Sequence, residues 1–223
     1  AIGVQAIVEK RSGCCGAIRH HLNDHDGGLS DARRNIDAWW PYLQPDAAQP
    51  AEAILINASG CGAMVKDYAH LLRDDPVYAE RAQRVVECTR DLAEWLPREF
   101  SAALERDAVR LSRRPTDSVA FHPPCTLQHG QQVRGEVEGF LSKLGVNVTP
   151  VAESHLCCGS AGTYSVLQPA LSQQLRDRKL AHLQAGKPQM LLSANIGCIT
   201  HLQTGTDAPV RHWIEWLDEA IAG

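Results

Sequence analysis

The amino-acid sequence predicts an α/β protein in which small, mainly parallel sheets are flanked by helices. Two observations lead to this fold class. Short apolar runs of strand length alternate with segments of helical period, and such alternation is typical of β-α-β units. Most cysteines follow the same alternation, since they come just after a predicted strand or at a strand-to-helix turn. In open α/β sheets, ligand sites lie at that edge.

Four elements are predicted in the first half of the chain. Residues 2–8 are a strand-like run at the start, and residues 29–43 place apolar side chains at helical spacing. A short apolar strand follows at 53–57. A polar-faced helix then spans roughly 77–109, and Cys88 falls on its apolar face. We therefore interpret Cys88 as a packed core residue.

The second half repeats this order of elements. A helix over 133–144 ends at Gly145, where a second strand-like run begins. A further helix containing Leu167, Leu171 and Leu175 ends at Gly186. An apolar strand at 190–194 follows, and residues 210–221 have the spacing of a closing amphipathic helix.

The composition is that of an ordinary globular protein. The chain has 223 residues, 44% of them hydrophobic and 22% charged, and its net charge is −4. This mild acidity argues against nucleic acid as a partner, because phosphate binding needs a concentrated basic face. No apolar run reaches the roughly 18 residues of a membrane span, and no signal-peptide pattern opens the chain. The chain starts at Ala1 without methionine, so we interpret it as a fragment of a longer polypeptide.

The cysteines form two copies of one arrangement, in which a Cys-Cys-Gly motif precedes a lone cysteine beside glycine. Seven of the eight cysteines belong to it: Cys14, Cys15 and Cys61 in the first copy, and Cys125, Cys157, Cys158 and Cys198 in the second. The copies correspond to predicted domains at 1–112 and 113–223. Their boundary is expected near residues 111–117, after the polar-faced helix.

Thiolates gathered in this way usually hold iron or zinc. The second copy supplies the four that an iron–sulfur cluster needs, whereas the first copy's counterpart of Cys125 would lie upstream of Ala1. Zinc sites usually use Cys-x-x-Cys knuckles, which this sequence lacks, so adjacent cysteines favour iron–sulfur. Disulfides are disfavoured, because a Cys-Cys pair does not readily bridge itself. We therefore expect a reducing, cytoplasmic setting.

Three histidines near the cysteines have open interpretations. His201 follows Cys198 by three residues and is either a ligand or hydrogen-bond partner of a cluster, or a helix-end cap. His122 and His155 either tune a cluster through hydrogen bonds or have only a structural role. The glycines do not form a dinucleotide fingerprint.

The order and spacing of these motifs resemble the cysteine-rich CCG domain. That domain is shared by the cysteine-rich subunit of heterodisulfide reductases, lactate-utilisation proteins and the iron–sulfur subunit of bacterial glycolate oxidase (glycolate dehydrogenase). Local segments most resemble the last of these, and they lie at 35–41, 58–63, 125–129, 154–164, 194–198 and 211–215. They are spread over nearly the whole chain.

The resemblance implies two tandem CCG repeats related by pseudo-twofold symmetry, forming the C-terminal half of such a subunit. The missing N-terminal region would be ferredoxin-like, with two [4Fe–4S] clusters. Here the resemblance implies an iron–sulfur cluster, expected to be [4Fe–4S], on Cys125, Cys157, Cys158 and Cys198. The first copy's Cys14, Cys15 and Cys61 would form an incomplete site.

As to activity, the resemblance implies an electron-transfer subunit of an oxidoreductase complex, with no catalytic residue on this chain. An FAD-binding partner subunit would oxidise glycolate, and electrons would pass to a quinone-type acceptor. The complex would lie in the cytoplasm, peripherally on the inner membrane through its partners.

The chain departs from heterodisulfide reductase at one position of each repeat. Repeats of that kind end in Cys-x-x-Cys, but Met64 and His201 occupy the last position here. The five-thiolate non-cubane cluster of that family therefore does not carry over directly. Three alternatives stay open: a thiol–disulfide reductase, a lactate-utilisation subunit, and a zinc-stabilised scaffold that docks partner subunits.

Overall fold

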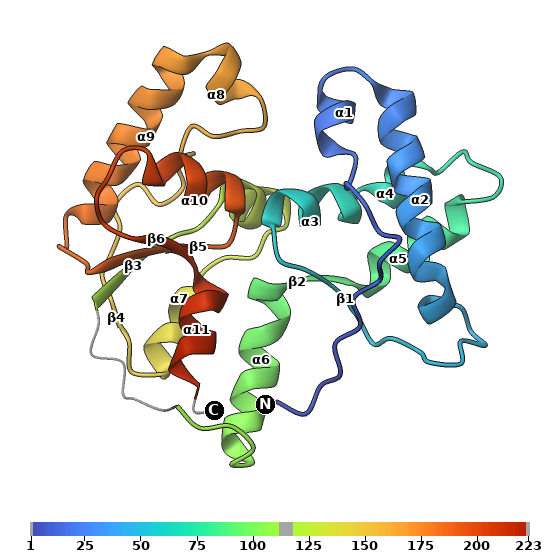
Figure 1. Cartoon of the computed structure of the whole chain (residues 1–223), viewed down its shortest axis with the longest axis horizontal. Coiled ribbons are helices and arrows are strands. Elements are labelled where there is room, and N and C mark those ends of the chain that lie inside the picture. The colour runs from blue at the N-terminus through green and yellow to red at the C-terminus, as the bar shows by residue number, and fades with distance from the viewer. Residues whose placement is uncertain (1, 112–117, 222–223) are drawn as a thin grey trace. The chain divides into compact units, whose positions relative to one another are not determined.

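The computed structural model describes residues 2–111 and 118–221 (Figure 1). The chain divides into two compact units: residues 5–92 form the first unit, and the described residues of 1–4 and 93–223 form the second. The domain boundary predicted near 111–117 falls mostly on residues 112–117, which lie outside the described residues. The repeat boundary at 112 therefore stays a prediction.

The first unit contains five helices and two strands among its described residues. In chain order they are α1 (Ala17–His21), α2 (His25–Leu43), β1 (Ile54–Ile56), α3 (Ser59–Lys66), α4 (Tyr68–Leu71), α5 (Ala79–Cys88) and β2 (Thr89–Asp91). β1 and β2 pair in parallel, with Ile54 opposite Thr89. This small parallel sheet agrees with the predicted fold class.

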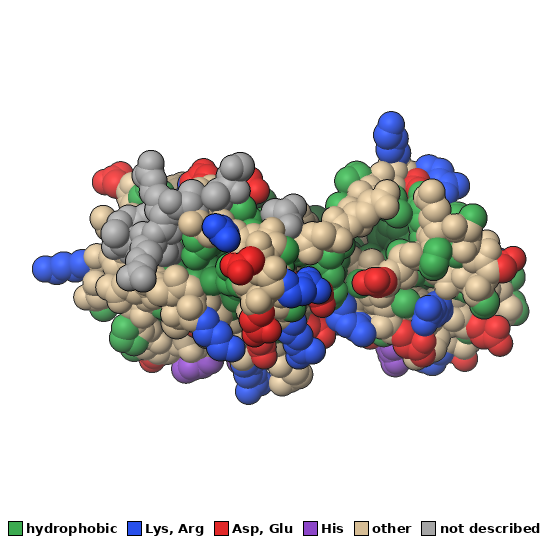
Figure 2. All heavy atoms as spheres, turned by 90° about the horizontal axis from the view of Figure 1, so that it is seen from below, with side chains coloured by type: hydrophobic (Ala, Val, Ile, Leu, Met, Phe, Trp, Pro, Cys, Tyr) green, Lys and Arg blue, Asp and Glu red, His purple; other side chains and the backbone are tan. Residues whose placement is uncertain are grey.

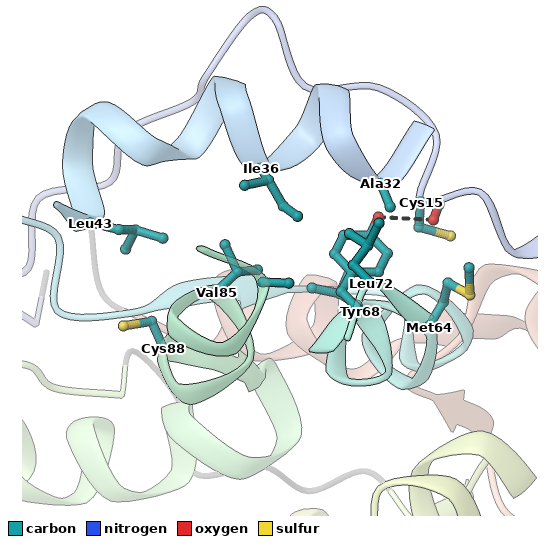
Figure 3. Packing of buried hydrophobic residues seen from close by; sticks show 11 residues of the cluster. Cys15, Ala32, Ile36, Leu43, Met64, Tyr68, Leu72, Val85 and Cys88 are labelled. Carbon is teal, nitrogen blue, oxygen red and sulfur yellow. Dashed lines mark hydrogen bonds between the residues drawn. The ribbon is translucent and has the colours of Figure 1, made fainter. Parts of the chain in front are cut away.

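The core of the first unit lies between α2 and the later helices (Figure 3). Ala32, Ile36 and Leu43 form the buried face of α2. They belong to one cluster with Val85 and Cys88 of α5, and Figure 3 shows Ile36 and Leu43 of α2 facing Val85 of α5. Cys88 is 6% exposed, so its prediction as a core residue is confirmed.

The second unit holds a four-stranded parallel sheet in the order β4-β3-β5-β6. Its described elements are α6 (Leu92–Glu105), β3 (Ser118–His122), the π-helix η1 (Thr126–Gly130), α7 (Glu136–Lys143), β4 (Asn147–Val148), α8 (Tyr164–Leu167), α9 (Pro169–Gln184), β5 (Met190–Ser193), α10 (Ile196–Gln203), β6 (Val210–His212) and α11 (Trp213–Ala220). β3 and β5 are central, and their side chains are almost wholly buried. Continuous apolar runs are expected where helices cover both faces of a sheet.

Aromatic side chains join three helices of this unit. The ring of Phe140 on α7 lies edge-on to those of Phe100 on α6 and Trp213 on α11. The distances between ring centroids are 5.5 Å and 6.1 Å. Edge-to-face pairs of this kind are worth about 0.5–1.5 kcal/mol beyond the area they bury. They help to hold α6, α7 and α11 together.

Three element predictions are wrong. Residues 2–8 form no strand: Val8 is 85% exposed, and the segment pairs with no other strand in the described chain. The helix predicted over 77–109 is interrupted by β2, which pairs with β1. The closing helix starts at Trp213, because residues 210–212 form β6 and pair with β5. In the last two cases, pairing between distant segments overrides the helical period.

The remaining helix and strand predictions agree with α2, β1, α7, β4, α9 and β5, except that Leu167, predicted in the same helix as Leu171 and Leu175, lies in the separate helix α8. No helix of the described chain combines the length and apolarity needed to cross a membrane. On the face shown in Figure 2, basic and acidic side chains are interspersed rather than gathered by sign.

Candidate metal centre

Three segments at one edge of the second unit's sheet carry the four cysteines of the second copy. Cys125 follows β3, Cys157 and Cys158 lie in the loop after β4, and Cys198 lies in the first turn of α10, just after β5. β3 and β5 are neighbours, but the chain continues from β3 to β4 on one side and from β5 to β6 on the other. Such a switch point is where open α/β sheets place their ligand sites.

Contacts between side chains connect all four sulfurs. The Cys157 side chain interacts with those of Cys125 and Cys158, and the Cys158 side chain also interacts with that of Cys198. Cys158 and Cys198 are almost fully buried, at 1% and 3% exposure. The structure therefore brings the four predicted sulfurs into one cluster, and their role as metal ligands stays a prediction.

These interactions divide the protons unequally among the four thiols. Donation from Cys125 lowers the pKa of Cys157, and donation from Cys158 lowers the pKa of Cys198. The pKa values of Cys125 and Cys158 are raised, first by these bonds and then by burial. In the metal-free cluster, Cys125 and Cys158 therefore hold their protons more tightly than Cys157 and Cys198 do. A cation that binds all four sulfurs must release the remaining protons, so its affinity rises with pH.

Backbone and amide N–H groups also point at these sulfurs. Gly159 adopts φ 91°, and its N–H donates to the Cys157 sulfur at 3.3 Å. Asn195 Nδ2 donates to the Cys198 sulfur at 3.5 Å. Donors of this kind stabilise thiolates and tune the potential of a bound metal centre.

Two buried side chains hold the loop that leads into the cysteine pair. Gln128 Nε2 donates to the backbone oxygen of Ser154 at 3.0 Å. The Lys179 ammonium, on α9, donates to the backbone oxygens of Glu153 at 2.8 Å and Ser154 at 3.2 Å. Burial lowers the pKa of Lys179. Because these carbonyls are satisfied from the protein interior, the loop approaches Cys157 in a fixed path.

His122, for which the sequence left a cluster-tuning and a structural role open, lies among the buried cysteines of the second unit. It ends β3, its side chain is 0% exposed, and its ring lies with Cys158 and Cys198 in a group whose ligand atoms are all within 4.8 Å of one another. It lies close enough to Cys198 to lower the pKa of that thiol, but no hydrogen-bond geometry joins them. The feature of the sequence that pointed to His122 was its position three residues before Cys125.

The first unit gathers three sulfurs in a similar way. Cys14 is exposed, Cys15 is buried and Cys61, in the first turn of α3, is half-buried. A hydrogen bond from Cys15 lowers the pKa of Cys61 to about 7. Gly16 adopts φ 86° and donates to the Cys14 sulfur at 3.5 Å, as Gly159 does in the second unit.

Buried polar side chains fix this cysteine pair too. Asn35 Nδ2 donates to the backbone oxygen of Cys14 at 2.9 Å. Tyr68 Oη donates to the backbone oxygen of Cys15 at 2.8 Å, the bond drawn as a dashed line in Figure 3. Asn35 and Tyr68 are themselves hydrogen-bonded at 3.2 Å. Each unit therefore has a rigid Cys-Cys-Gly turn, held by polar groups from its own interior.

Three other residues considered from the sequence have the following surroundings. His201 Nε2 is paired with Ser172 Oγ at 3.1 Å. Met64, at the corresponding place in the first unit, packs in the core. The His155 side chain is exposed, while its backbone oxygen contacts His129 Nε2 at 3.1 Å.

The fold and the two sulfur clusters define a cysteine-rich α/β protein with thiols gathered beside small parallel sheets. The sequence matches the CCG cysteine-rich domain family over residues 1–66 and 119–203, and the chain belongs to that family. The two matched segments fall on the two copies of the cysteine arrangement.

Three curated relatives illustrate the similarity. The glycolate oxidase iron-sulfur subunit of Escherichia coli (strain K12) is 49% identical over 220 residues, which are 99% of this chain and 51% of that protein. The probable glycolate oxidase iron-sulfur subunit of Bacillus subtilis (strain 168) is 28% identical over 92% of this chain and 44% of that protein. Lactate utilization protein A of Shouchella clausii (strain KSM-K16) is 26% identical over 92% of this chain and 82% of that protein. The chain thus spans about half the length of the first two.

Proposed function

We propose that this chain is part of the iron–sulfur subunit of a glycolate oxidase and transfers electrons. In this proposal a flavin-bearing partner subunit, carrying FAD, oxidises glycolate, and the electrons pass through the second unit to a quinone-type acceptor. No residue of this chain contacts glycolate. The similarity to the two glycolate oxidase iron-sulfur subunits supports this assignment.

The observation that carries the proposal is the convergence of Cys125, Cys157, Cys158 and Cys198 at the switch point of the sheet. Four sulfurs in one cluster, with the pKa values of Cys157 and Cys198 lowered, suit the iron ions of a cluster, which require deprotonated ligands. A bound cluster would supply one-electron transfer. The protein would hold it between β3 and β5, exclude water through the burial of Cys158 and Cys198, and direct N–H donors at its sulfurs.

The finer parts of the proposal concern cluster type and surroundings. The second unit would hold a [4Fe–4S] cluster, while Cys14, Cys15 and Cys61 would form an incomplete second site. A ferredoxin-like region would precede this chain in the complete protein. The complex would lie at the cytoplasmic face of the inner membrane, held there through its partners.

Anaerobic reconstitution of the chain with iron and sulfide tests the proposal. We expect a brown protein with about four irons in the second unit and a reversible electron paramagnetic resonance signal on reduction. Cys198→Ser should remove this signal, whereas Cys88→Ala, in the core of the first unit, should retain it. Wild-type protein that binds no iron would contradict the proposal.

Zinc is favoured by one specific observation, since three buried ligands within 4.8 Å of one another suit a single small ion. Metal analysis of protein purified from cells distinguishes a zinc site from an iron–sulfur cluster. One zinc and no iron would support a scaffold that docks partner subunits. Lactate is the other substrate class to assay with the partner subunit, because lactate utilization protein A is also similar to this chain.

A further inference from the structure

His122 is fully buried although its ring carries two polar nitrogen atoms. The side chain is 0% exposed, and neither Nδ1 nor Nε2 has a hydrogen-bond partner in the described chain. Buried polar groups without partners are rare in proteins, and each requires a physical reason. A neutral imidazole has one donor and one acceptor nitrogen, so both capacities are unused.

The strand around His122 does not supply that reason. The backbone is occupied, since His122 lies opposite Ser193 in the β3–β5 ladder and its carbonyl accepts a bond from Ser193 Oγ at 3.0 Å. An apolar residue would fit this buried strand end at lower cost in desolvation. Other histidines near the site, His129 and His201, do have partners for their rings. His122 alone of these three is left with both nitrogens free.

The surroundings of the ring indicate what it is suited to bind. A His122 nitrogen lies within 4.8 Å of the sulfurs of Cys158 and Cys198, and all three residues are buried. Separations of that size are compatible with ligands of one centre, because metal–nitrogen and metal–sulfur bonds are about 2.0 and 2.3 Å long. A group that binds the imidazole nitrogen would therefore lie between His122 and the sulfurs of Cys158 and Cys198.

We propose that His122 gives one ring nitrogen to the metal centre of the second unit, so that its donors are four thiolates and one imidazole. This rests on the proposed function, which places an iron–sulfur centre there. A neutral imidazole adds no negative charge, and imidazole ligands raise the reduction potential of iron–sulfur centres relative to thiolates. His122 would thereby favour acceptance of an electron by this centre.

Pulsed electron paramagnetic resonance of the reduced, reconstituted chain tests the bond directly. In wild-type protein we expect a strong nitrogen hyperfine coupling that changes when the histidines carry ¹⁵N. His122→Asn should lose this coupling. The matched control His155→Asn should keep it, because His155 is close to Cys157 in sequence but its side chain is exposed.

A second variant covers the case in which His122→Asn fails to fold. His122→Cys supplies a thiolate in place of the imidazole, so we expect it to retain the cluster, lack the nitrogen coupling and have a lower midpoint potential in a redox titration. A midpoint unchanged in His122→Cys, or a wild-type cluster with no strong coupling to ¹⁵N-histidine, would overturn the inference and leave the proposed function standing.

Absorption spectra of the chain with cobalt(II) alone show whether a negative result concerns the role of His122 or the proposed function. If the wild-type chain assembles no iron–sulfur cluster but binds cobalt(II) with thiolate absorption bands that shift in His122→Asn, the proposed function is wrong and His122 remains a ligand. If the spectrum of bound cobalt(II) is identical in both proteins, or if the chain binds neither metal, the inference is wrong as well.

Discussion

Gly159 shows how a single residue controls the cysteine pair. Its φ of 91° suits glycine, and a Cβ at this position would meet the backbone oxygen of Ser172 on α9. Ser172 Oγ in turn donates to the Gly159 oxygen at 2.8 Å. The turn is therefore packed directly on the helix that follows it.

We expect Gly159→Ala to lower the free energy of unfolding by about 2–5 kcal/mol, because a positive φ costs about 1–2 kcal/mol and the overlap with backbone adds about 1–3. Gly162→Ala is the matched control, since Gly162 also has a positive φ, 58°, but open space around its α-carbon. Urea unfolding of both variants measures the difference. Equal losses would mean that contact with Ser172 is unimportant.

Cys61 allows a prediction about pH at the same scale. Its pKa is lowered from 9.0 to about 7 by the hydrogen bond from Cys15. In the reduced, metal-free protein, the thiolate fraction of Cys61 should therefore rise as pH increases through 7. Thiolates are the reactive form, so alkylation of Cys61 should follow the same curve.

Mass spectrometry after short iodoacetamide pulses between pH 5.5 and 9 measures that curve. Cys15→Ala removes the donor, and we expect it to move the midpoint for Cys61 to higher pH. Cys88→Ala is the control, and it should leave the midpoint near 7. A midpoint that stays unchanged without Cys15 would contradict the role given to this hydrogen bond.

At the scale of elements, the sequence predicts what local patterns determine. The period of α2 and the apolar runs of β1 and β5 lie within the segments themselves, so these elements are recognisable without the rest of the chain. β2 is different. Thr89 and Asp91 are buried in a strand that pairs with β1, and Thr89 Oγ1 donates to the Val85 oxygen at 2.7 Å where α5 ends. That information is in residues 54–56, far from 89 in sequence.

In the candidate site too, some residues could be predicted from local patterns and others could not. The cysteine pairs and their glycines could be predicted because the motif is contiguous, and its repetition indicated which residues correspond. The position of His122 depends on how β3 and β5 pack and on burial of the strand end, which no local pattern records. By sequence, His201 was as good a candidate for a ligand as His122, since it lies three residues from Cys198. Its ring is instead hydrogen-bonded to Ser172 Oγ.

At the scale of the whole molecule, the two units differ in the sulfurs they can offer a metal. The second unit brings together four, with an imidazole beside them, whereas the first has three within the described residues. Anything that binds only the folded state stabilises the unit that holds it, by about 2.7 kcal/mol when free ligand is at 100 times its dissociation constant. Metal loading should therefore stabilise the units unequally.

Hydrogen-exchange mass spectrometry of iron-loaded and metal-free chain, both under anaerobic reducing conditions, measures this difference. We expect exchange in β3 and β5 to slow by about 100-fold or more on loading, while β1 and α2 change little, because 2.7 kcal/mol corresponds to about that factor. Cys198→Ser should abolish the slowing, since it removes one sulfur of the second unit. If the protection appeared instead around Cys15 and Cys61, the centre would belong to the first unit, and the three-sulfur cluster would be sufficient to hold it.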